Sequence, residues 1–403
     1  KKRNQSVTTE EEIHAQYLSL ICQEGIEHFP NNKTFTDEIF YQLDKLKPRV
    51  YLPFICRFMW NYFPCEDVFK HIILDEGICY TFNMMDREEI FRDNVVHYSI
   101  FNKNENVSEW NIDDGYSNDS KADTYPRRGL LSGADNSLQI TLIHNIRDTD
   151  YTCLEDVLGY SVALHTPHAI PLVKKQHFQV PFDTSVMAAI QPRMMTTSQE
   201  VKKYNPGDRE CYFTNERPLK YFKIYTPENC RLECLVNYTL KQCGCVNFFM
   251  PRVNSTLICG NGNYDCMKNA ERDLKLIELN NHMDVKGNRN RETYCDCMPL
   301  CTELYYDIEQ TQTEWKWNEK FRVRVPEGYM YRQNNIKLAK LTVFFKTEQF
   351  LSSQRNEMYG PIDFLANFGG LLGLFTGFSI LSLIEIIYYL TVRIFCDIRQ
   401  RNE

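Results

Sequence analysis

Residues 211–245 read CYFTNERPLKYFKIYTPENCRLECLVNYTLKQCGC, and ten of the sixteen cysteines of this 403-residue chain lie in the block from Cys211 to Cys301. A reducing compartment seldom tolerates such a density of cysteines. Zinc is the competing explanation, but the spacings are C-x3-C and C-x-C, and the usual C-x2-C knuckle is missing. The block therefore predicts a disulfide framework that forms outside the cytosol.

The cysteine spacing also predicts local structure. A helix is expected over residues 227–241, and Cys230 and Cys234 project from one face of it. Cys295 and Cys297 share a face if they lie on a strand. Because four helical residues rise ~6 Å and two strand residues rise ~6.6 Å, two parallel disulfide rungs between a helix and a strand are geometrically natural.

A second helix is expected over residues 265–281, with Ala270, Leu274 and Ile277 as its buried edge. Four further cysteines can close the loop between the two helices, and each bridge adds about 2–4 kcal/mol by restricting the unfolded chain. The block is thus predicted to be a rigid two-helix lever attached to a sheet. The four cysteines are Cys243, Cys245, Cys259 and Cys266.

Composition excludes several classes of protein. With 43% hydrophobic and 25% charged residues, the chain can bury a core and is not disordered. A net charge of −7 argues against a nucleic-acid partner. A mean hydropathy of −0.45 excludes a polytopic membrane protein and leaves room for a single span. Glycosylation sequons, which fit a secretory route, occur at Asn4, Asn32, Asn106, Asn118, Asn237 and Asn254.

One segment has the length and apolarity of a transmembrane helix. From Phe364 to Ile384 the sequence FLANFGGLLGLFTGFSILSLI has no charged residue across 21 positions, and a helix of that length covers about 30 Å. The cysteine-rich part precedes this span and is therefore expected outside the cell, with Arg393–Glu403 in the cytosol. Cys396 would then be a reduced thiol or a palmitoylation site.

Small residues recur within the span in steps of four, three and four, which places them on one helix face. Two interpretations stand side by side: a helix–helix contact through small-x3-small motifs, and a pore. The pore is favoured by Glu385, an ionisable group within the apolar run, and by glycines that invite a break in the helix. The small residues are Ala366, Gly370, Gly373 and Gly377.

The remaining sequence alternates short strand-like runs with polar loops. No catalytic motif is present, and the nine histidines show no metal-ligand spacing, so the sequence predicts no enzyme, metal or cofactor site. We expect strands over 51–60, 178–182 and 337–345, mobile loops over 102–129 and 196–210, and a helix over 10–22 with Thr9 as its N-cap.

Three phrases resemble one known family. GGLLGLFTGFSILSLIE at 369–385 is similar to the second transmembrane segment of the degenerin/epithelial sodium channel superfamily. The cysteine block resembles the thumb of that family, and the 211–245 phrase and CDCMPLCTELYYDIEQTQTEW at 295–315 are similar to its insect pickpocket branch. The similarity runs from about residue 50 to the end of the chain, with several motifs in the same order and spacing.

The resemblance implies an α+β fold, in which a large disulfide-rich extracellular domain precedes a C-terminal transmembrane helix. The extracellular domain would have a central antiparallel sheet with helical finger, thumb and knuckle elements. A first transmembrane helix and the strand after it would precede residue 1. The implied parts are a finger-like helical region (1–80), palm and β-ball strands with mobile loops (81–210), the stapled thumb (211–301), palm strands and knuckle (302–360), a pore-lining transmembrane segment (361–395) and a cytoplasmic tail (396–403).

The resemblance also implies a disulfide pattern. Cys79 would pair with a cysteine that precedes residue 1. Cys22 and Cys153 are then left over, and we predict that they pair with each other because free pairs are uncommon outside the cell. The implied pairs are Cys56–Cys65, Cys211–Cys301, Cys230–Cys297, Cys234–Cys295, Cys243–Cys266 and Cys245–Cys259.

Members of the family are trimers around a central cation pore, and the resemblance assigns pore roles to residues of this chain. Gly377, Phe378 and Ser379 would form a selectivity filter whose oxygen ligands suit Na⁺, the permeant ion. Glu385 would attract cations below the filter. Ala366 matches the degenerin position, where a bulky side chain is expected to hold the pore open. The other pore and gate residues would be Asn367, Gly369, Gly370 and Gly373.

The implied function is a subunit of a trimeric, gated, sodium-selective, amiloride-sensitive cation channel of the plasma membrane, whose ectodomain senses the stimulus or an extracellular ligand. The alternative is a single-pass, disulfide-rich receptor or adhesion protein whose glycine stripe joins the spans of two copies. That alternative leaves Glu385 and the filter triplet unexplained. The sequence does not discriminate among proton, peptide, osmotic, chemical and mechanical gating, or between a homotrimer and a heterotrimer.

Overall fold

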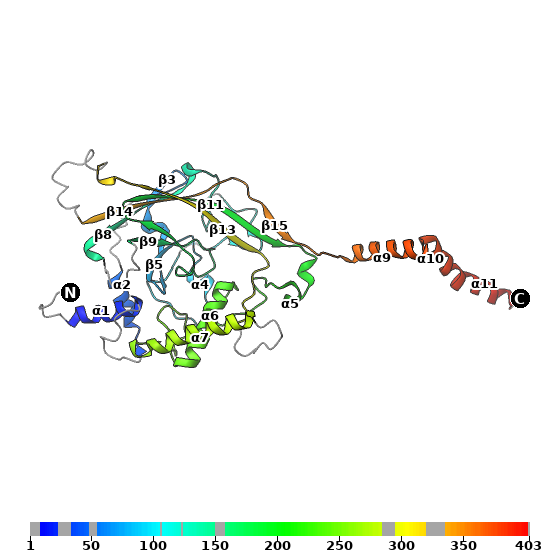
Figure 1. Ribbon diagram of the computed structural model, residues 1–403, viewed down its shortest axis with the longest axis horizontal. Helices are drawn as coiled ribbons and strands as arrows, with labels where there is room; N and C mark the ends of the chain where they lie inside the picture. The colour runs from blue at the N-terminus through cyan, green and yellow to red at the C-terminus, as the bar shows by residue number, and fades with distance from the viewer. Residues whose placement is uncertain are drawn as a thin grey trace. The chain divides into compact units, whose positions relative to one another are not determined.

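A computed structural model describes residues 9–22, 34–47, 55–104, 107–121, 124–149, 158–283, 295–319 and 335–401. The chain divides into two compact units. The first, here called the sheet unit, comprises residues 1–196 and 206–353, and the second, here called the helical unit, comprises residues 197–205 and 354–403. Figure 1 gives the course of the chain and the labels of its helices and strands.

A seven-stranded sheet is the largest element of the sheet unit (Figure 1). Its β11 lies parallel to β14, with Ser185 opposite Lys340, whereas the β13–β11, β14–β8, β8–β2 and β2–β3 pairs are antiparallel. The expectation of an antiparallel sheet is therefore wrong at one pair, because the Cys211–Cys301 block separates β11 from β14 in sequence and supplies the long connection that a parallel pair needs. The order is β13 (Glu303–Glu314), β11 (Thr184–Thr197), β14 (Ile336–Phe345), β8 (Leu138–Asn145), β2 (Ile55–Phe58) and β3 (Asn61–Pro64), and β15 (Ser352–Arg355) pairs with β11.

The strands of this sheet follow the period-two pattern that buries one face. Along β11, Val186 and Ala188 are buried while Met187 between them is exposed. Ala339 of β14 belongs to the same buried cluster. The strand expected over 337–345 is thus confirmed in an interior position of the sheet.

Four smaller two-stranded sheets are described. The strand expected over 178–182 is confirmed as β10, one residue shorter than expected. The sheets are β4 (Phe69–Leu74) with β5 (Gly77–Phe82), β9 (Gly159–Val162) with β10 (Phe178–Pro181), β1 (Thr34–Phe35) with β12 (Ile258–Cys259), and β6 (Trp110–Asn111) with β7 (Gly115–Tyr116).

The two helices predicted in the cysteine block are present and lie side by side (Figure 1). In α6 (Pro227–Cys243), the Thr226 side chain accepts a hydrogen bond from the Asn229 N–H and caps the helix. Gly244, with φ +72°, ends it in the left-handed conformation that glycine adopts without strain. In α7 (Tyr264–Met283) the predicted edge is confirmed, with Ala270 and Leu274 buried and Ile277 half-buried.

The remaining helical elements of the sheet unit are short, apart from two near its N-terminus. The predicted N-terminal helix begins at Thr9 itself, so Thr9 is the first helical residue and not the cap that was expected. The longer two are α1 (Thr9–Cys22) and α2 (Glu38–Leu46), and the short ones are α3 (Cys65–Val68), α4 (Arg87–Ile90), α5 (Pro206–Arg209) and 3-10 turns at Ala134–Asn136, Ile146–Asp148 and Asn261–Asn263.

Two sequence expectations need correction in the sheet unit. The polar stretch 102–129 is not a plain loop, because it contains the β6–β7 hairpin and the buried Ile112, and its Asn102 side chain donates to the Met85 carbonyl. The strand expected over 51–60 is shorter: β2 ends at Phe58, and residues 51–54 lie outside the described residues.

The helical unit contains α9 (Pro361–Thr376), α10 (Ile380–Ile387), a π-helical turn (Tyr388–Arg393), α11 (Ile394–Arg401) and a 3-10 turn at Val201–Lys203. Within the described residues, no single helix has both the length and the apolarity needed to cross a bilayer. Pro361–Thr376 and Ile380–Gln400 meet that test only together, and they are bent by 84°. The expected C-terminal transmembrane segment is therefore not one continuous helix, and the backbone leaves the helix at Gly377, among the glycines that invite a break.

Candidate functional site

The break between α9 and α10 begins at a glycine. The Gly377 N–H donates to the Gly373 carbonyl (3.0 Å), and the φ of Gly377 is +64°. A side chain at this left-handed position would cost about 1 kcal/mol because its Cβ would approach the carbonyl oxygen. Gly377 therefore acts as the C-cap that stops α9, and the predicted stripe of four small residues does not continue along one helix.

The other side of the break is a helix start. Ser379 is extended, and its side-chain oxygen accepts a hydrogen bond from the Ser382 N–H (3.3 Å). The Ser379 carbonyl accepts the first helical hydrogen bond, from Leu383 N–H (3.1 Å). The G-x-S triplet is thus a stop signal and a start signal separated by Phe378, and it exposes a short non-helical stretch of backbone between two apolar helices.

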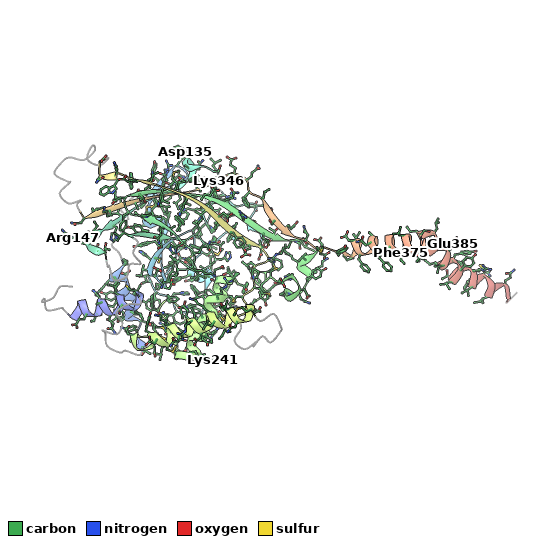
Figure 2. All side chains as sticks on the ribbon, in the orientation of Figure 1. Asp135, Arg147, Lys241, Lys346, Phe375 and Glu385 are labelled. Carbon is green, nitrogen blue, oxygen red and sulfur yellow. A yellow bond between two sulfur atoms is a disulfide. The ribbon has the colours of Figure 1, made fainter. Side chains whose placement is uncertain are left out.

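The structure distributes the predicted pore residues on both sides of this break. Glu385 follows it on α10, and Figure 2 labels Glu385 and Phe375 in the helical unit. All of the predicted pore residues are exposed or half-buried in the single chain. Large apolar side chains of α9, such as Phe364 (62% exposed) and Leu365 (66% exposed), are exposed as well. The predicted pore residues on α9 are Ala366, Asn367, Gly369, Gly370 and Gly373.

Glu385 borders a groove of about 390 Å³ on the helical unit. The groove is lined by one carboxylate, two side chains with hydroxyls and two aliphatic side chains, and the π-helical turn supplies two of its residues. A carboxylate held within an otherwise apolar helix favours a cation or water next to it. The other lining residues are Ser382, Ile386, Tyr389 and Leu390.

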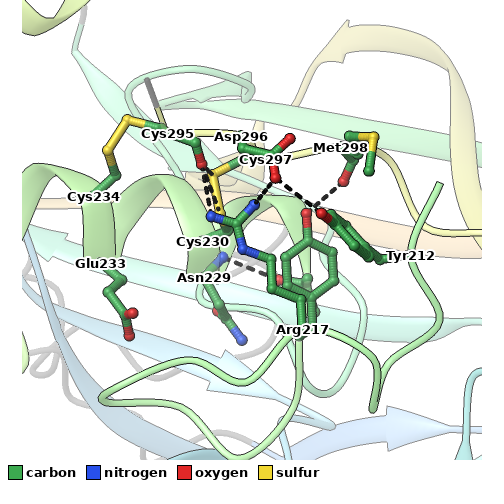
Figure 3. Close-up of a disulfide and its surroundings, with 12 residues drawn as sticks. Tyr212, Arg217, Asn229, Cys230, Glu233, Cys234, Cys295, Asp296, Cys297 and Met298 are labelled. Carbon is green, nitrogen blue, oxygen red and sulfur yellow. Dashed lines mark hydrogen bonds and ion pairs between the residues drawn. A yellow bond between two sulfur atoms is a disulfide. The ribbon is translucent and has the colours of Figure 1, made fainter. Parts of the chain in front are cut away.

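Six disulfides join the described cysteines, and they are the six pairs that the resemblance implies. Two of them link successive turns of α6 to the segment 295–297, as Figure 3 shows. That segment is not the expected strand, because Asp296 has φ +31° and breaks the extended conformation. The disulfides are Cys56–Cys65, Cys211–Cys301, Cys230–Cys297, Cys234–Cys295, Cys243–Cys266 and Cys245–Cys259.

An arginine that the sequence did not single out supports this disulfide ladder (Figure 3). Arg217 donates to the Cys295 carbonyl (3.0 Å) and forms an ion pair with Asp296 (3.1 Å). The Tyr212 hydroxyl donates to the same Asp296 carboxylate (2.9 Å). Burial, and next the hydrogen bond to Asp296, raise the pKa of Tyr212. These contacts hold the segment 295–297 against the segment 212–217, which precedes α6, independently of the sulfur bridges.

The structure describes three of the four remaining cysteines and three of the six sequon asparagines. Cys22 is disulfide-bonded, and its predicted partner Cys153 lies outside the described residues. Cys79 is a free, half-buried thiol whose pKa burial raises to about 12, and Cys396 is free and exposed. Of the six sequon asparagines, Asn118, Asn237 and Asn254 are exposed, and Asn4, Asn32 and Asn106 lie outside the described residues.

A buried histidine, His168, is a second feature that sequence reasoning missed. His168 is 1% exposed, and its ring stacks on Trp110 with the centroids 5.5 Å apart. Its carbonyl accepts from the Asn229 side chain (3.2 Å) near the start of α6. Burial, and to a smaller extent His165, lower the pKa of His168 to about 4. Across the described ranges, no three His, Cys, Asp or Glu side chains come together as a metal site.

The fold and the site together define a class of protein: a disulfide-stapled α+β domain followed by a broken apolar helix. The family model for the amiloride-sensitive sodium channel matches residues 1–389, and the chain belongs to this family. The resemblance to degenerins and pickpocket proteins is thereby confirmed.

Relatives with curated names span insects and nematodes. Pickpocket protein 28 of Drosophila melanogaster is 27% identical over 375 residues, which cover 90% of this chain and 60% of that protein. Sodium channel protein Nach of the same species is 23% identical over 90% of this chain and 62% of that protein. Degenerin-like protein unc-105 of Caenorhabditis elegans is 24% identical over 67% of this chain and 30% of that protein. The chain thus spans about 60% of the length of the first two relatives.

Proposed function

We propose that this chain is a subunit of a gated, sodium-selective cation channel of the amiloride-sensitive type in the plasma membrane. Three subunits, identical or related, surround the pore. The sheet unit is extracellular and senses the stimulus or an extracellular ligand. Residues 396–403 lie in the cytoplasm.

One observation carries the proposal: the helix break at Gly377–Ser379 between two apolar helices. Non-helical backbone at membrane depth is tolerated only where it is buried in protein or lines a water-filled path. Glycine at 377 and the small Ser379 let neighbouring backbones approach, and carbonyl and hydroxyl oxygens are the ligands that a partly dehydrated Na⁺ prefers. Three such breaks around one axis make a selectivity filter.

The exposed surface of α9 and α10 supports the membrane setting. Every residue of 361–371 is exposed in the single chain, although most of them are apolar. A contiguous apolar surface of this kind is covered by lipid or by another protein. The receptor alternative also accounts for such a surface, but not for Glu385 and the break together.

The start of α9 offers a route from the ectodomain to the gate. Pro361 is the first residue of α9, and the Gly360 N–H donates to the Asp363 carboxylate (3.2 Å). Within the helical unit, the Ser198 N–H donates to the Arg355 carbonyl (3.0 Å), a few residues before α9. Motion of the segment around Ser198 therefore reaches Pro361 through only six residues of chain. In this proposal Ala366, on the second turn of α9, closes the pore by close approach of the three copies.

Two-electrode voltage clamp of oocytes that express the full-length protein tests this function. Because the stimulus is unknown, Ala366→Phe is recorded beside the wild type. We expect the Ala366→Phe channel to carry a standing Na⁺ current that amiloride blocks. Surface biotinylation controls for delivery. Normal surface delivery without Na⁺ current in either protein, even with co-expressed related subunits, would contradict the channel and favour the receptor.

A further inference from the structure

Ser382 lies one turn after the break, and its hydroxyl caps the residue that begins the turn. The Ser382 N–H donates to the Ser379 Oγ (3.3 Å), and the Ser379 N–H donates to the Ser382 Oγ (3.4 Å). The two hydroxyl oxygens are 3.3 Å apart. Such reciprocal capping satisfies two backbone donors at once and fixes the conformation of the residue before the helix.

Few other contacts position Ser379. Its side chain is exposed in the single chain, so packing does not hold it. The backbone before it turns at Gly377, which tolerates a wide range of conformations. Among the described residues, Ser379 forms hydrogen bonds with Ser382, and its carbonyl accepts one from Leu383 N–H. The Ser382 hydroxyl is therefore the side chain that sets where Ser379 sits.

We propose that Ser382 is a positioning residue for ion selectivity, an inference that rests on the proposed function. Its hydroxyl keeps Ser379 extended and keeps the Ser379 Oγ directed at the first turn of α10. Without that hydroxyl the Ser379 N–H loses its partner, and the oxygens of the filter no longer keep one spacing. Discrimination between Na⁺ and K⁺ depends on the number and spacing of those oxygens, so the loss falls on selectivity.

Ser382 also borders the groove that contains Glu385, so direct contact with passing ions is the competing role. A double-mutant cycle separates the two roles. If Ser382 acts through Ser379, the pair Ser379→Ala and Ser382→Ala together lowers the Na⁺/K⁺ permeability ratio no further than one of them alone. If the two serines contact ions independently, the fold-changes multiply.

The first experiment compares Ser382→Thr with Ser382→Val in the full-length channel, by bi-ionic reversal potentials in oocytes. The two variants have the same branched shape and differ by one hydroxyl. We expect Thr to keep the wild-type Na⁺/K⁺ permeability ratio and Val to lower it about fivefold, the scale of a lost helix cap. Thr391→Val is the matched control, because the Thr391 hydroxyl bonds to the Ile387 carbonyl in the same apolar segment but away from the break.

The outcomes separate this inference from the proposed function. Equal permeability ratios for Ser382→Thr and Ser382→Val would overturn the role of Ser382 without contradicting the channel function. Fold-changes that multiply in the double-mutant cycle would do the same. Absence of Na⁺ current in both the wild type and Ala366→Phe, with both proteins at the surface, would overturn both. If Ser382→Val reaches the surface but carries no current, the Na⁺/K⁺ permeability ratio of Ser382→Thr tests the inference. A Ser382→Thr ratio that departs from the wild-type ratio overturns the inference.

Discussion

Asp37 and Arg252 are 215 residues apart in sequence, and the Arg252 guanidinium donates to the Asp37 carboxylate at 2.5 Å. Asp37 occupies the N-cap position of α2, yet its side chain caps no backbone N–H of that helix. The Arg252 side chain is 6% exposed and also donates to the Tyr98 hydroxyl. This ion pair therefore attaches α2 to the connection between α6 and α7.

Removal of the Asp37 carboxylate is expected to destabilise the protein. Asp37→Ala leaves a buried guanidinium without its anion, which costs about 1–3 kcal/mol. The thermal unfolding midpoint of the purified full-length protein should fall. Asp307→Ala is the matched control, because its ion pair with Arg193 is largely exposed and is expected to contribute less than about 0.5 kcal/mol. Equal midpoints for the two variants would contradict the assigned role of Asp37.

Asp183 stabilises the sheet from a left-handed turn. With φ +57°, its carboxylate accepts from the Trp317 indole (2.8 Å) and from Lys337, while its N–H donates to the Leu338 carbonyl (2.7 Å). Asp183→Ala removes both side-chain bonds and leaves a strained φ, so we expect a loss of about 2–4 kcal/mol.

Asp183→Asn is the graded comparison for that variant. Asn tolerates the left-handed conformation and keeps an acceptor for Trp317, although it loses the charge opposite Lys337. Its thermal midpoint should lie between those of the wild type and Asp183→Ala. A midpoint for Asn at or below that for Ala would count against this account of the turn.

The burial of His168 makes stability depend on pH. Its folded pKa, about 4, is below the ordinary value of 6.5. Between those pH values the unfolded chain binds a proton at this site and the folded protein does not, so stability falls as pH falls from about 6.5 to about 4. His168→Phe preserves stacking on Trp110 and removes the titration. Between pH 7 and pH 5, we expect the thermal unfolding midpoint of His168→Phe to fall less than that of the wild type.

Other, half-buried histidines limit the size of that change. Burial also lowers the pKa of His71, His97, His144 and His165, so the variant should reduce the acid sensitivity without abolishing it. Identical pH dependence in wild type and His168→Phe would show that His168 does not contribute.

Local signals made part of this fold predictable. The ends of α6 follow from Thr226, Pro227 and Gly244, each of which acts within a few residues of its own position. The two-rung disulfide ladder follows from the similar lengths of four helical residues and two extended residues along the chain. Asp296 nevertheless bends the segment that was expected to be a strand. Such a bend depends on the contacts of Asp296 with Arg217 and Tyr212, which lie about 80 residues away in sequence.

Long-range relationships were not predictable from one sequence. The parallel pairing of β11 with β14, and the ion pair of Asp37 with Arg252, join distant segments and leave no periodic pattern. At the candidate site, glycine spacing predicted a break in the apolar helix but gave neither its angle nor the capping by Ser382. Those features depend on backbone conformations at Gly377 and Ser379 that only the structure specifies.

Cadmium block of a Ser379→Cys channel tests the central claim most directly. If three copies of the break surround one ion path, three thiols meet there, and soft thiolate ligands bind Cd²⁺ tightly. We predict that micromolar-scale Cd²⁺ blocks the Na⁺ current of Ser379→Cys and leaves the wild-type current intact. A Ser379→Cys current that resists Cd²⁺ and keeps the wild-type Na⁺/K⁺ permeability ratio would contradict the account.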